Sequence, residues 1–343
     1  MKNSIYLVMN YWPKEDYWLC SEFYKRHITY RLIGIDSKVR KLRYAKMGGG
    51  GGIWKILRFA HAIKVAVNTK KDEIVVVMDD TPTSVFISCT LSFLGRKNNV
   101  ICLNMMDSLH PNLAKKMLYR AAFRRMYASA NNQRIMELYS SLYGLPQNRF
   151  FYLPDCIANW GMKILQRKEP IECGGYIFSG GSTFRDWDLF IDVAWKLPQY
   201  RFVGIARKTG FPKKQLPNNV KMLFDVDETT FNDYLKKCSV VFMPINVKTQ
   251  GGQIVIFKGG LYRKAVVTTD TAAIRTYIAD GRNGLLTRFK DSQSAIQALN
   301  KVMDNDNFRN NLGNGLYDDI RQLTPTHFVD LLTDFLKKKG FKI

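Results

Sequence analysis

Short apolar runs alternate with longer amphipathic stretches along most of the chain. Runs such as Ile74–Met78 and Val240–Met243 are rich in β-branched residues and have the length of buried strands. Stretches such as Ile53–Val67 instead place their apolar residues at the spacing of one helix face. Strands that alternate with helices predict an α/β fold with parallel, doubly wound sheets.

The same pattern predicts the individual elements. The expected strands cover residues 5–9, 33–35, 74–78, 99–104, 126–130, 150–153, 176–179, 200–205, 220–224, 240–243 and 265–269. The expected helices cover residues 53–67, 83–94, 112–126, 132–143, 188–197, 230–238, 253–262, 272–278 and 326–339. The consecutive glycines Gly48 to Gly52 cannot hold a helix or a strand and predict a loop.

The alternation of strands and helices is interrupted once. It stops at Pro154–Met162 and restarts near Gly175, which predicts two Rossmann-like lobes. The expected segments are residues 1–157, residues 158–325 and a terminal helix in residues 326–343. Because parallel sheets of this kind bind ligands at the carboxyl ends of their strands, we expect a site in a cleft between the lobes.

The chain is strongly basic. Lys and Arg number 52 against 29 Asp and Glu, which gives a formal net charge of +23, and the excess is spread over both halves. Such a charge attracts nucleic acid, anionic membranes or phosphorylated ligands, although a basic surface also serves solubility alone. No zinc finger, RNP-type aromatic strand or helix-turn-helix pattern is present. A nucleic-acid-binding protein is therefore the alternative from another class, and nucleic acid is not an expected partner.

The cysteines and the apolar runs bear on the compartment. The six cysteines form no C-x-x-C pair and have no metal-ligand spacing with the four histidines. Cys102 lies inside an apolar run, as expected of a buried, reduced thiol. The longest apolar stretch, Val85–Leu94, is far shorter than the ~20 residues of a membrane span, and the first residues do not resemble a signal peptide. We expect a cytoplasmic protein, soluble or peripherally bound to a membrane.

Four segments of the second half carry a resemblance to a known family. They are YIFSGGSTFRDWDLFIDVAWKLP (176–198), YRFVGIA (200–206), FNDYLKKCSVVFMPI (231–245) and GGQIVIFKGGLYRKAVVTTDTAAIRTYIADGRNGLL (251–286). In order, they resemble the strand with its glycine-rich turn, the next strand, the helix and strand that end in proline, and the donor helix of GT-B glycosyltransferases. The resemblance is strongest to the retaining bacterial enzymes, family 4-like, that build surface polysaccharides. In the first half, residues 128–156 are similar to the last part of the acceptor lobe of that family.

The resemblance implies a GT-B fold and a glycosyltransferase that moves a sugar from a nucleotide sugar to a glycan acceptor. It assigns acceptor binding to residues 1–157 and donor binding to residues 158–325, with residues 326–343 packed back toward the first lobe. Many related enzymes extend a lipid-linked glycan in surface polysaccharide, O-antigen or capsule biosynthesis. A sugar-nucleotide epimerase shares the fold and is the second enzyme alternative, since a fold alone does not determine the reaction.

One motif of the family is not preserved. The two positions of its Glu-x7-Glu motif fall at Gln250 and Lys258. In the family the second glutamate holds the ribose hydroxyls of the donor, and lysine has no acceptor atom for that role. Lys258 is therefore expected to contact the diphosphate, unless the donor sits differently.

The first candidates for binding the donor diphosphate follow an expected strand. Gly180 and Gly181 end the strand and Ser182 follows; glycine there lets the backbone approach a phosphate, and an ordinary turn is the alternative. Arg185 lies where the resemblance places a phosphate-binding lysine, and a guanidinium can grip phosphate with two N–H groups. The alternative is a solvent-facing arginine beside Asp186.

A second phosphate site is expected before a helix. Gly251, Gly252 and Gln253 precede residues 254–262, and the N-terminus of a helix binds anions. The letters of a metal-binding Asp-x-Asp motif occur at Asp225 and Asp227, but the layout of the family puts this segment near the donor base. We therefore expect no metal and no other cofactor, with the nucleotide sugar as co-substrate and its leaving group stabilised by N–H groups and cations.

The acceptor hydroxyl needs a base within hydrogen-bond reach. Asp107 and His110 lie in the loop that follows an expected strand, where related enzymes have a histidine or aspartate that faces the cleft. A structural role, such as capping the helix that begins near Asn112, is an alternative for either residue. Asp79 and Asp80, after the preceding strand, are the reserve candidates.

Basic residues of the first half predict contact with an anionic membrane surface. The stretch Lys38–Lys46 is basic, and Lys116, Arg120 and Arg124 recur every four residues on an expected helix. Each basic residue near an anionic surface contributes ~1 kcal/mol, so we expect electrostatic docking at the inner face of the cytoplasmic membrane without deep insertion. A modest apolar row on the same helix, for which the protein core is an alternative location, consists of Leu113, Met117 and Ala121.

Overall fold

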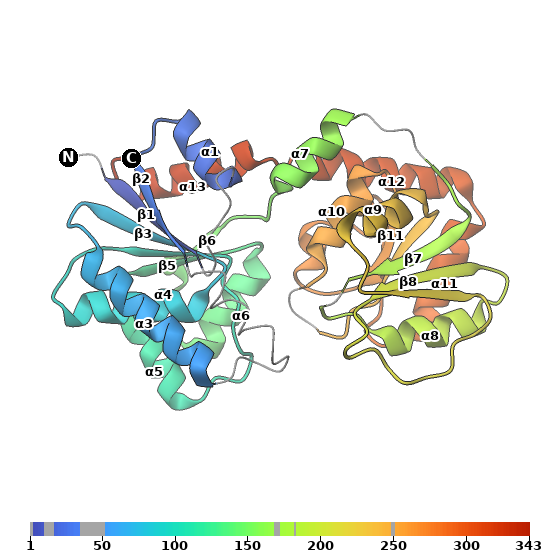
Figure 1. The fold of residues 1–343 in the computed structure, drawn as a ribbon, viewed down its shortest axis with the longest axis horizontal. Helices are drawn as coiled ribbons and strands as arrows, with labels where there is room; N and C mark the ends of the chain where they lie inside the picture. The colour runs from blue at the N-terminus through green and yellow to red at the C-terminus, as the bar shows by residue number, and fades with distance from the viewer. Residues whose placement is uncertain (1–2, 10–16, 35–51, 168–171, 182, 248–250) are drawn as a thin grey trace. The chain divides into compact units, whose positions relative to one another are not determined.

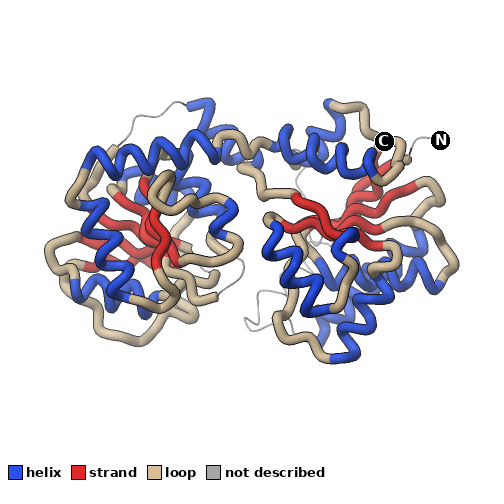
Figure 2. Tube along the Cα trace, turned by 180° about the vertical axis from the view of Figure 1, so that it is seen from behind, coloured by secondary structure: helices blue, strands red, loops and turns tan. Residues whose placement is uncertain are grey.

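The computed structural model of the protein describes residues 3–9, 17–34, 52–167, 172–181, 183–247 and 251–343. The chain divides into two compact units, of which the first contains Met1–Asp155 and Pro325–Ile343 and the second Cys156–Thr324. Each unit has one six-stranded parallel sheet with helices on both faces (Figure 2). The prediction of an α/β protein with two doubly wound lobes is confirmed.

The sheet of the first unit has the strand order β2-β1-β3-β4-β5-β6, and every neighbouring pair is parallel. The order changes direction between β1 and β3. Helices α1 and α13 lie on one face of this sheet, and α3 to α6 lie on the other (Figure 1). The strands are β1 (Ser4–Met9), β2 (Tyr30–Ile33), β3 (Glu73–Met78), β4 (Val100–Leu103), β5 (Met126–Ala130) and β6 (Phe150–Tyr152). The helices are α1 (Trp18–Lys25), α3 (Gly52–Asn68), α4 (Thr81–Phe93), α5 (Leu113–Ala122), α6 (Gln133–Tyr143), the short 3-10 helix η1 (Gln147–Arg149) and α13 (Pro325–Lys338).

Side-chain caps determine where the helices of this unit begin. Asp80 Oδ1 accepts a hydrogen bond from the backbone N–H of Thr83 at 3.1 Å at the start of α4. Asn112 caps α5 in the same way, and Asn132 caps α6. Gly144 ends α6 in the left-handed conformation with φ of 64°, which glycine adopts without strain.

Helix α13 belongs to the first unit although it ends the chain. Its Phe335 ring stacks on Phe151 of β6 with centroids 3.8 Å apart. Asp330 of α13 forms an ion pair of 2.7 Å with Arg26, which follows α1. These contacts place the last helix against the sheet and against α1.

The sheet of the second unit has the order β12-β11-β10-β7-β8-β9, again with parallel neighbours throughout. This is the strand order of dinucleotide-binding folds, and its change of direction lies between β7 and β10. The strands are β7 (Tyr176–Gly180), β8 (Arg201–Ala206), β9 (Val220–Phe224), β10 (Val240–Met243), β11 (Ala265–Thr269) and β12 (Leu285–Thr287). The helices are α7 (Ala158–Arg167), α8 (Trp187–Lys196), α9 (Glu228–Lys237), α10 (Gln253–Leu261), the 3-10 helix η2 (Ile274–Thr276), α11 (Ser292–Met303) and α12 (Asp306–Ile320).

The central strands of the second unit are buried on both faces, as expected of a covered parallel sheet. In β10, Val241 packs into a cluster that contains residues of α9, α10 and α12. Its neighbour Phe242 points the other way, into a cluster with α8 and α11. Because successive side chains of a strand alternate between faces, one apolar run supplies both cores.

Several expected elements differ from the structure. Residues 272–278 form only η2 rather than a full helix, and the strand expected at 33–35 is β2, which ends at Ile33. The helix expected at 112–126 ends at Ala122 because the chain enters β5 at Met126. No helix within the described residues is long and apolar enough to cross a bilayer.

Candidate functional site

The glycine turn after β7 is built around one arginine. Arg185 Nε donates a hydrogen bond of 2.7 Å to the carbonyl oxygen of Gly180. Gly181 has φ of 118°, and a Cβ atom on it would lie 2.9 Å from Arg185 Nη2. Glycine is therefore required here both by the backbone conformation and by the close approach of the guanidinium.

Arg185 is buried rather than solvent-facing. Its relative exposure is 7%, and no ion pair joins it to Asp186, which instead caps α8 by accepting from the N–H of Leu189 at 3.0 Å. Burial lowers the pKa of Arg185 to about 10. Its Nη1 is buried and has no hydrogen-bond partner among the described residues. A buried guanidinium with an unpartnered N–H favours an anionic acceptor at that position.

The start of α10 lies beside this guanidinium. A Cβ on Gly252 would lie 3.4 Å from Arg185 Nη1, so the arginine side chain approaches the helix N-terminus closely. Gly252 is the N-cap residue with φ of 89°, and no side chain caps the helix, whose first residue is Gln253. Gly251 precedes it with φ of 154°. The backbone N–H groups of the first turn and the guanidinium thus converge at one place, which favours an anion.

The donor residues expected from the sequence therefore come together at the change of direction in the sheet. Gly180 ends β7 and Gly181 follows it, and the segment after β10 is joined to this turn by a bridge between Arg185 and Ile245. Ser182 and Gln250 lie outside the described residues.

Lys258 makes contacts that the sequence did not predict. It is only 6% exposed, and its Nζ donates to Glu228 Oε1 at 2.8 Å and to Asn232 Oδ1 at 2.9 Å, both on α9. The ammonium also lies 5.4 Å from the ring centroid of Trp160. The ammonium hydrogen-bonded to Glu228 lowers the pKa of that carboxyl, whose side chain remains 72% exposed. The carboxylate absent from position 258 is thus present 30 residues earlier.

Asp225 and Asp227 have structural roles. Asp227 caps α9 by accepting from the N–H of Thr230 at 2.7 Å, and this backbone hydrogen bond lowers its pKa. Asp225 has φ of 51° and accepts from the backbone N–H of Lys208 at 3.3 Å. Within the described ranges no group of three or more Asp, Glu, His and Cys residues is arranged to hold a metal ion.

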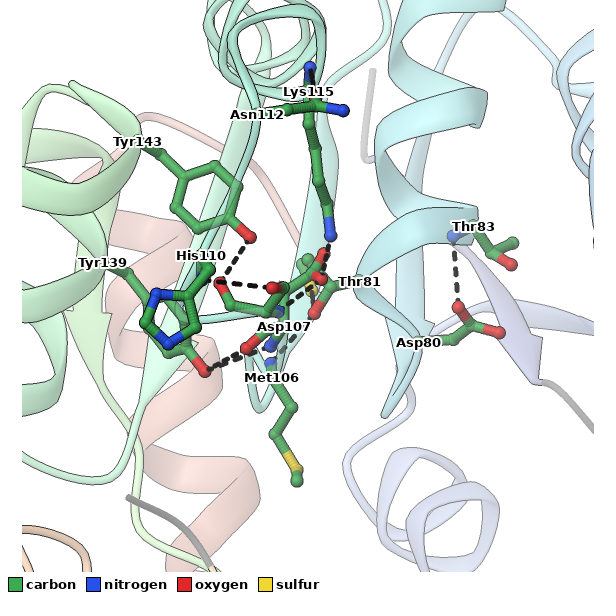
Figure 3. Close-up of polar contacts among 12 residues, drawn as sticks. Asp80, Thr81, Thr83, Met106, Asp107, His110, Asn112, Lys115, Tyr139 and Tyr143 are labelled. Carbon is green, nitrogen blue, oxygen red and sulfur yellow. Dashed lines mark hydrogen bonds and ion pairs between the residues drawn. The ribbon is translucent and has the colours of Figure 1, made fainter. Parts of the chain in front are cut away.

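In the first unit, Asp107 lies in a network of polar contacts after β4 (Figure 3). Its carboxylate forms an ion pair with Lys115 of α5. Its backbone N–H donates to Tyr139 Oη at 3.0 Å, and Tyr143 Oη donates to the carbonyl of Ser108 at 2.8 Å. Asp107 Oδ2 is buried and lacks a partner in the part of the chain that the structure describes. Lys115 therefore holds one carboxylate oxygen of Asp107, and the other makes no hydrogen bond to a described residue.

His110 is placed differently from Asp107. Its side chain is exposed, and only its backbone N–H is held, by Ser108 Oγ at 3.1 Å. Neither residue caps α5, because Asn112 does so with its own side chain at 2.9 Å from the N–H of Lys115. The alternative of a helix cap for Asp107 or His110 is therefore wrong.

The two reserve carboxylates differ from each other. Asp80 is buried, caps α4 and pairs with Arg58, so it is fully engaged in structure. Asp79 has φ of 51° and accepts from Asn104 Nδ2 at 3.1 Å. Its side chain is reachable from solvent, but surrounding protein atoms raise its pKa to about 6, and Asp80 adds in the same direction. Sequence reasoning had no signal for this difference.

The expected basic row Lys116, Arg120 and Arg124 is only partly on α5, because the helix ends at Ala122 and Arg124 lies in the turn that follows. Arg120 Nε donates to the carbonyl of Tyr143 at 3.2 Å, so this side chain holds the end of α6. Lys116 and Arg124 form no ion pair with any described residue. Leu113 and Met117 are 71% and 61% exposed, so the alternative that the apolar row faces the core is wrong. The basic stretch 38–46 lies outside the described residues.

Comparison with known proteins agrees with this geometry. Residues 210–318, which lie in the second unit, match the family described as "Glycosyl transferases group 1". Together with the two doubly wound units, this match makes the protein a glycosyltransferase of the GT-B fold. No curated protein matches the sequence.

Solved structures with the same fold include proteins of three bacteria. Anabaena HepE in complex with UDP and glucose aligns with a TM-score of 0.68 at 14% identity, over 98% of this chain and 100% of that one. An E. coli structure described as trehalose-6-phosphate bound with UDP-2-fluoro glucose has a TM-score of 0.73 at 11% identity, over 97% and 99%. A glycosyltransferase from Rickettsia africae has a TM-score of 0.70 at 9% identity, over 99% of both chains. At identities this low, the structural likeness establishes the fold alone.

Proposed function

We propose that this glycosyltransferase moves a sugar from a nucleotide sugar to a lipid-linked glycan acceptor, in cell-surface polysaccharide, O-antigen or capsule biosynthesis. The observation that carries the proposal is the buried Arg185, whose unpartnered Nη1 lies beside the uncapped N-terminus of α10. A diphosphate completes both, because its oxygens accept from the guanidinium and from the backbone N–H groups. UDP in the HepE structures supports a uridine diphosphate donor.

The same contacts serve the chemical step. As the bond between the anomeric carbon and the diphosphate breaks, negative charge grows on the leaving oxygen. Preorganised donors at that position stabilise the transition state more than the ground state. Arg185 and the first turn of α10 provide such donors without a metal ion.

Glu228 is the residue that we assign to the ribose. Its carboxylate is largely exposed and is held by Lys258 on one side, so the remaining lone pairs can accept from two hydroxyls. Lys258 then acts as a positioning residue rather than as a phosphate ligand, because it is buried and two of its three N–H donors are occupied by Glu228 and Asn232.

Asp107 is the proposed base. The hydroxyl oxygen of the acceptor attacks the anomeric carbon, its proton passes to Asp107 Oδ2, and the nucleoside diphosphate leaves. The ion pair with Lys115 holds the other carboxylate oxygen in place. His110, exposed on the same loop, is the second candidate for this proton.

The proposed location is the inner face of the cytoplasmic membrane. Lys116 and Arg124, with no ion-pair partner among the described residues, and the exposed Leu113 and Met117 support peripheral binding. Arg120 contributes less than expected because it is already bonded to Tyr143.

Calorimetric titration with UDP, ADP and GDP tests the donor site. Wild type should bind one of these diphosphates, and Arg185→Ala should weaken that binding by ~10–150-fold, which corresponds to ~1.5–3 kcal/mol for a charge-assisted hydrogen bond. Arg288→Ala removes an exposed arginine of the same unit and should change nothing. Undiminished affinity in Arg185→Ala, with an unchanged melting temperature, would contradict the assignment. Transfer of labelled sugar into lipid-extractable material tests the acceptor.

A further inference from the structure

Exposed apolar side chains gather along two helices of the first unit. Ile56, Phe59, Ile63 and Val67 recur on one face of α3, and Ile56 is 68% exposed. Beside them, at the end of α4, Phe93 is 90% exposed. Helices α3 and α4 pack against each other, so these side chains form one surface. A contiguous apolar surface of this kind marks a binding site more often than chance.

Two adjoining hollows run along this surface. The first, of about 390 Å³, is lined by Val85, Phe86, Leu118 and Tyr119 among others, and the second, of about 420 Å³, by residues of α3 and α4. Phe59 lines the second hollow and Phe86 the first. Their rings pack edge to face, with centroids 5.3 Å apart. A 17-residue helix such as α3 is ~25 Å long, which sets the length of this track.

Of the two hollows, only the first is lined by charged residues. Lys55, Arg58 and Lys115 line it, and Lys55 forms no ion pair with a described residue. Arg58 Nε is buried without a partner, although another nitrogen of that side chain pairs with Asp80. Tyr119 is 98% buried, and its hydroxyl also lacks a partner in the described chain. These donors suit an anionic, oxygen-rich group.

Lys115 connects the polar end of the track to the proposed base. It lines the first hollow and pairs with Asp107 on its other side (Figure 3). A group bound among Lys55, Arg58 and Lys115 therefore lies next to the residue that we assign to proton removal. The far end of the track, at Phe93, is lined mainly by apolar side chains and by no charged residue.

We propose that the acceptor is a long-chain alkyl or isoprenoid phosphate carrying the glycan, with its hydrocarbon chain along α3 and α4 and its phosphate among Lys55, Arg58 and Lys115. The assignment rests on the proposed function and gives the acceptor a chemical class and a location. A single chain fits better than a flat bilayer because most of the apolar side chains line hollows that a chain can fill. The phosphate end fits the three cations, whereas the other end has none.

Titration of the whole protein with farnesyl phosphate, below the concentration at which it aggregates, tests the track. We expect geranyl phosphate, five carbons shorter, to bind at least tenfold more weakly, because each buried methylene contributes about fourfold. Farnesol and inorganic phosphate, each lacking one half of the ligand, should also bind at least tenfold more weakly. Equal affinity for the two prenyl phosphates would overturn the proposal.

Space-filling variants locate the ligand. Ala114→Trp fills the first hollow and Thr90→Trp the second, and each should weaken farnesyl phosphate at least tenfold while the melting temperature stays near that of wild type. Tyr24→Ser removes an exposed aromatic side chain from α1 and should bind farnesyl phosphate as wild type does. Wild-type affinity in both tryptophan variants, with vesicle binding lost in Phe93→Ser, would mean that this surface docks on a bilayer instead.

The donor site provides an independent control. UDP binding depends on residues of the second unit, none of which lines the track. Normal UDP binding without any affinity for farnesyl phosphate would refute the lipid track alone. Absence of UDP binding in wild type would refute the donor assignment and leave the lipid result standing.

Discussion

Reversing the charge of Lys258 separates a structural role for this residue from a direct role in phosphate binding. Lys258 is 6% exposed, and both of its hydrogen bonds go to α9, at 2.8 Å and 2.9 Å. In Lys258→Glu, two neighbouring carboxylates replace the ion pair, and the carboxylate at position 258 is buried. Breaking a buried pair in this way typically costs ~3–5 kcal/mol, so we expect a loss of folding stability in that range.

Two further variants show how much of this loss of stability comes from the buried charge at position 258. Lys258→Met removes the charge but keeps the packing against Trp160, and it leaves Glu228 free to hydrate because that side chain is 72% exposed. The cost should stay within about 1 kcal/mol, since an apolar residue can replace a buried ion pair with little loss. The double variant Glu228→Lys with Lys258→Glu restores a pair of opposite charges and should recover at least ~1 kcal/mol of the loss.

The pH dependence gives a further check on Lys258→Glu. A buried carboxyl at position 258 has a pKa above its unfolded value, so the stability it retains is present at low pH and is lost as pH rises. Urea unfolding at pH 5 and pH 8 should show a larger deficit relative to wild type at pH 8. A deficit that is equal at both pH values would contradict a buried, repelled carboxylate.

Nucleotide binding completes the test. If Glu228 holds the ribose and Lys258 only positions it, Lys258→Met should reduce UDP affinity about tenfold and weaken discrimination against 2′-deoxy-UDP. Glu228→Gln should do the same. A collapse of UDP binding in Lys258→Met with discrimination intact would show that Lys258 contacts the diphosphate, which would refute this reasoning.

Three further outcomes follow from other parts of the two sites. Asp107→Asn should lower turnover by ~10²–10⁴-fold with UDP affinity unchanged, while His110→Ala should do so only if His110 is the base. Steady-state kinetics measure turnover and calorimetry measures UDP affinity, so together they show which residue is the base. Full activity in both variants would leave Asp79 as the candidate. Gly252→Ala should weaken UDP binding and stability, because φ is 89° and its Cβ would lie 2.5 Å from Met243 Cε; an unchanged melting temperature would contradict this. Asp79→Asn should stabilise the protein at pH 8 but not at pH 3, because a carboxyl with its pKa raised to about 6 destabilises the fold increasingly as pH rises from the lower unfolded pKa to the folded one; a pH-independent effect in urea unfolding would refute that.

The central strands β10 and β11 of the second unit were predictable because their residues are buried on both faces of the sheet. Their expected bounds agree with the structure at Val240–Met243 and Ala265–Thr269. Continuous apolar, β-branched runs of this length leave little choice of conformation. The bounds of half-exposed elements such as α5 and β2 depend on what the next segment does, which the local pattern does not contain.

Helices α11 and α12 were missed although their signals are present. Asp291 and Asn305 each cap a helix by accepting a backbone N–H three residues later. Apolar residues follow at helical spacing in both, for example at Leu299 and Val302 of α11. Helix α7 is harder to predict, since its first residue, Ala158, has φ of 48° and the helix contains Gly161. Capping residues together with apolar spacing predict α11 and α12, whereas only packing on α10 explains α7.

The donor site was predictable where local sequence determines local geometry. A glycine turn after a strand and glycines before a helix indicate phosphate contacts wherever the two segments lie. Their convergence on Arg185 depends on β7 and β10 being neighbours, which is set by the strand order and not by either segment. The same holds for Asp107, whose partner Lys115 sits on the next helix and whose contact Tyr139 sits on the one after.

If Glu228 holds the ribose as we propose, the chemistry of the family motif is kept although position 258 carries lysine. A position that needs a carboxylate facing a ligand is defined in space, and neighbouring helices can supply the group as well as the original residue can. Here α10 supplies the cation and the first turn of α9 supplies the carboxylate. The N-terminus of α9 favours a negative charge, and the buried ammonium adds to this, so Glu228 stays ionised at neutral pH. A sequence comparison at position 258 shows only that the glutamate is absent. Glu228 lies 30 positions earlier and contacts Lys258 only because α9 and α10 pack together.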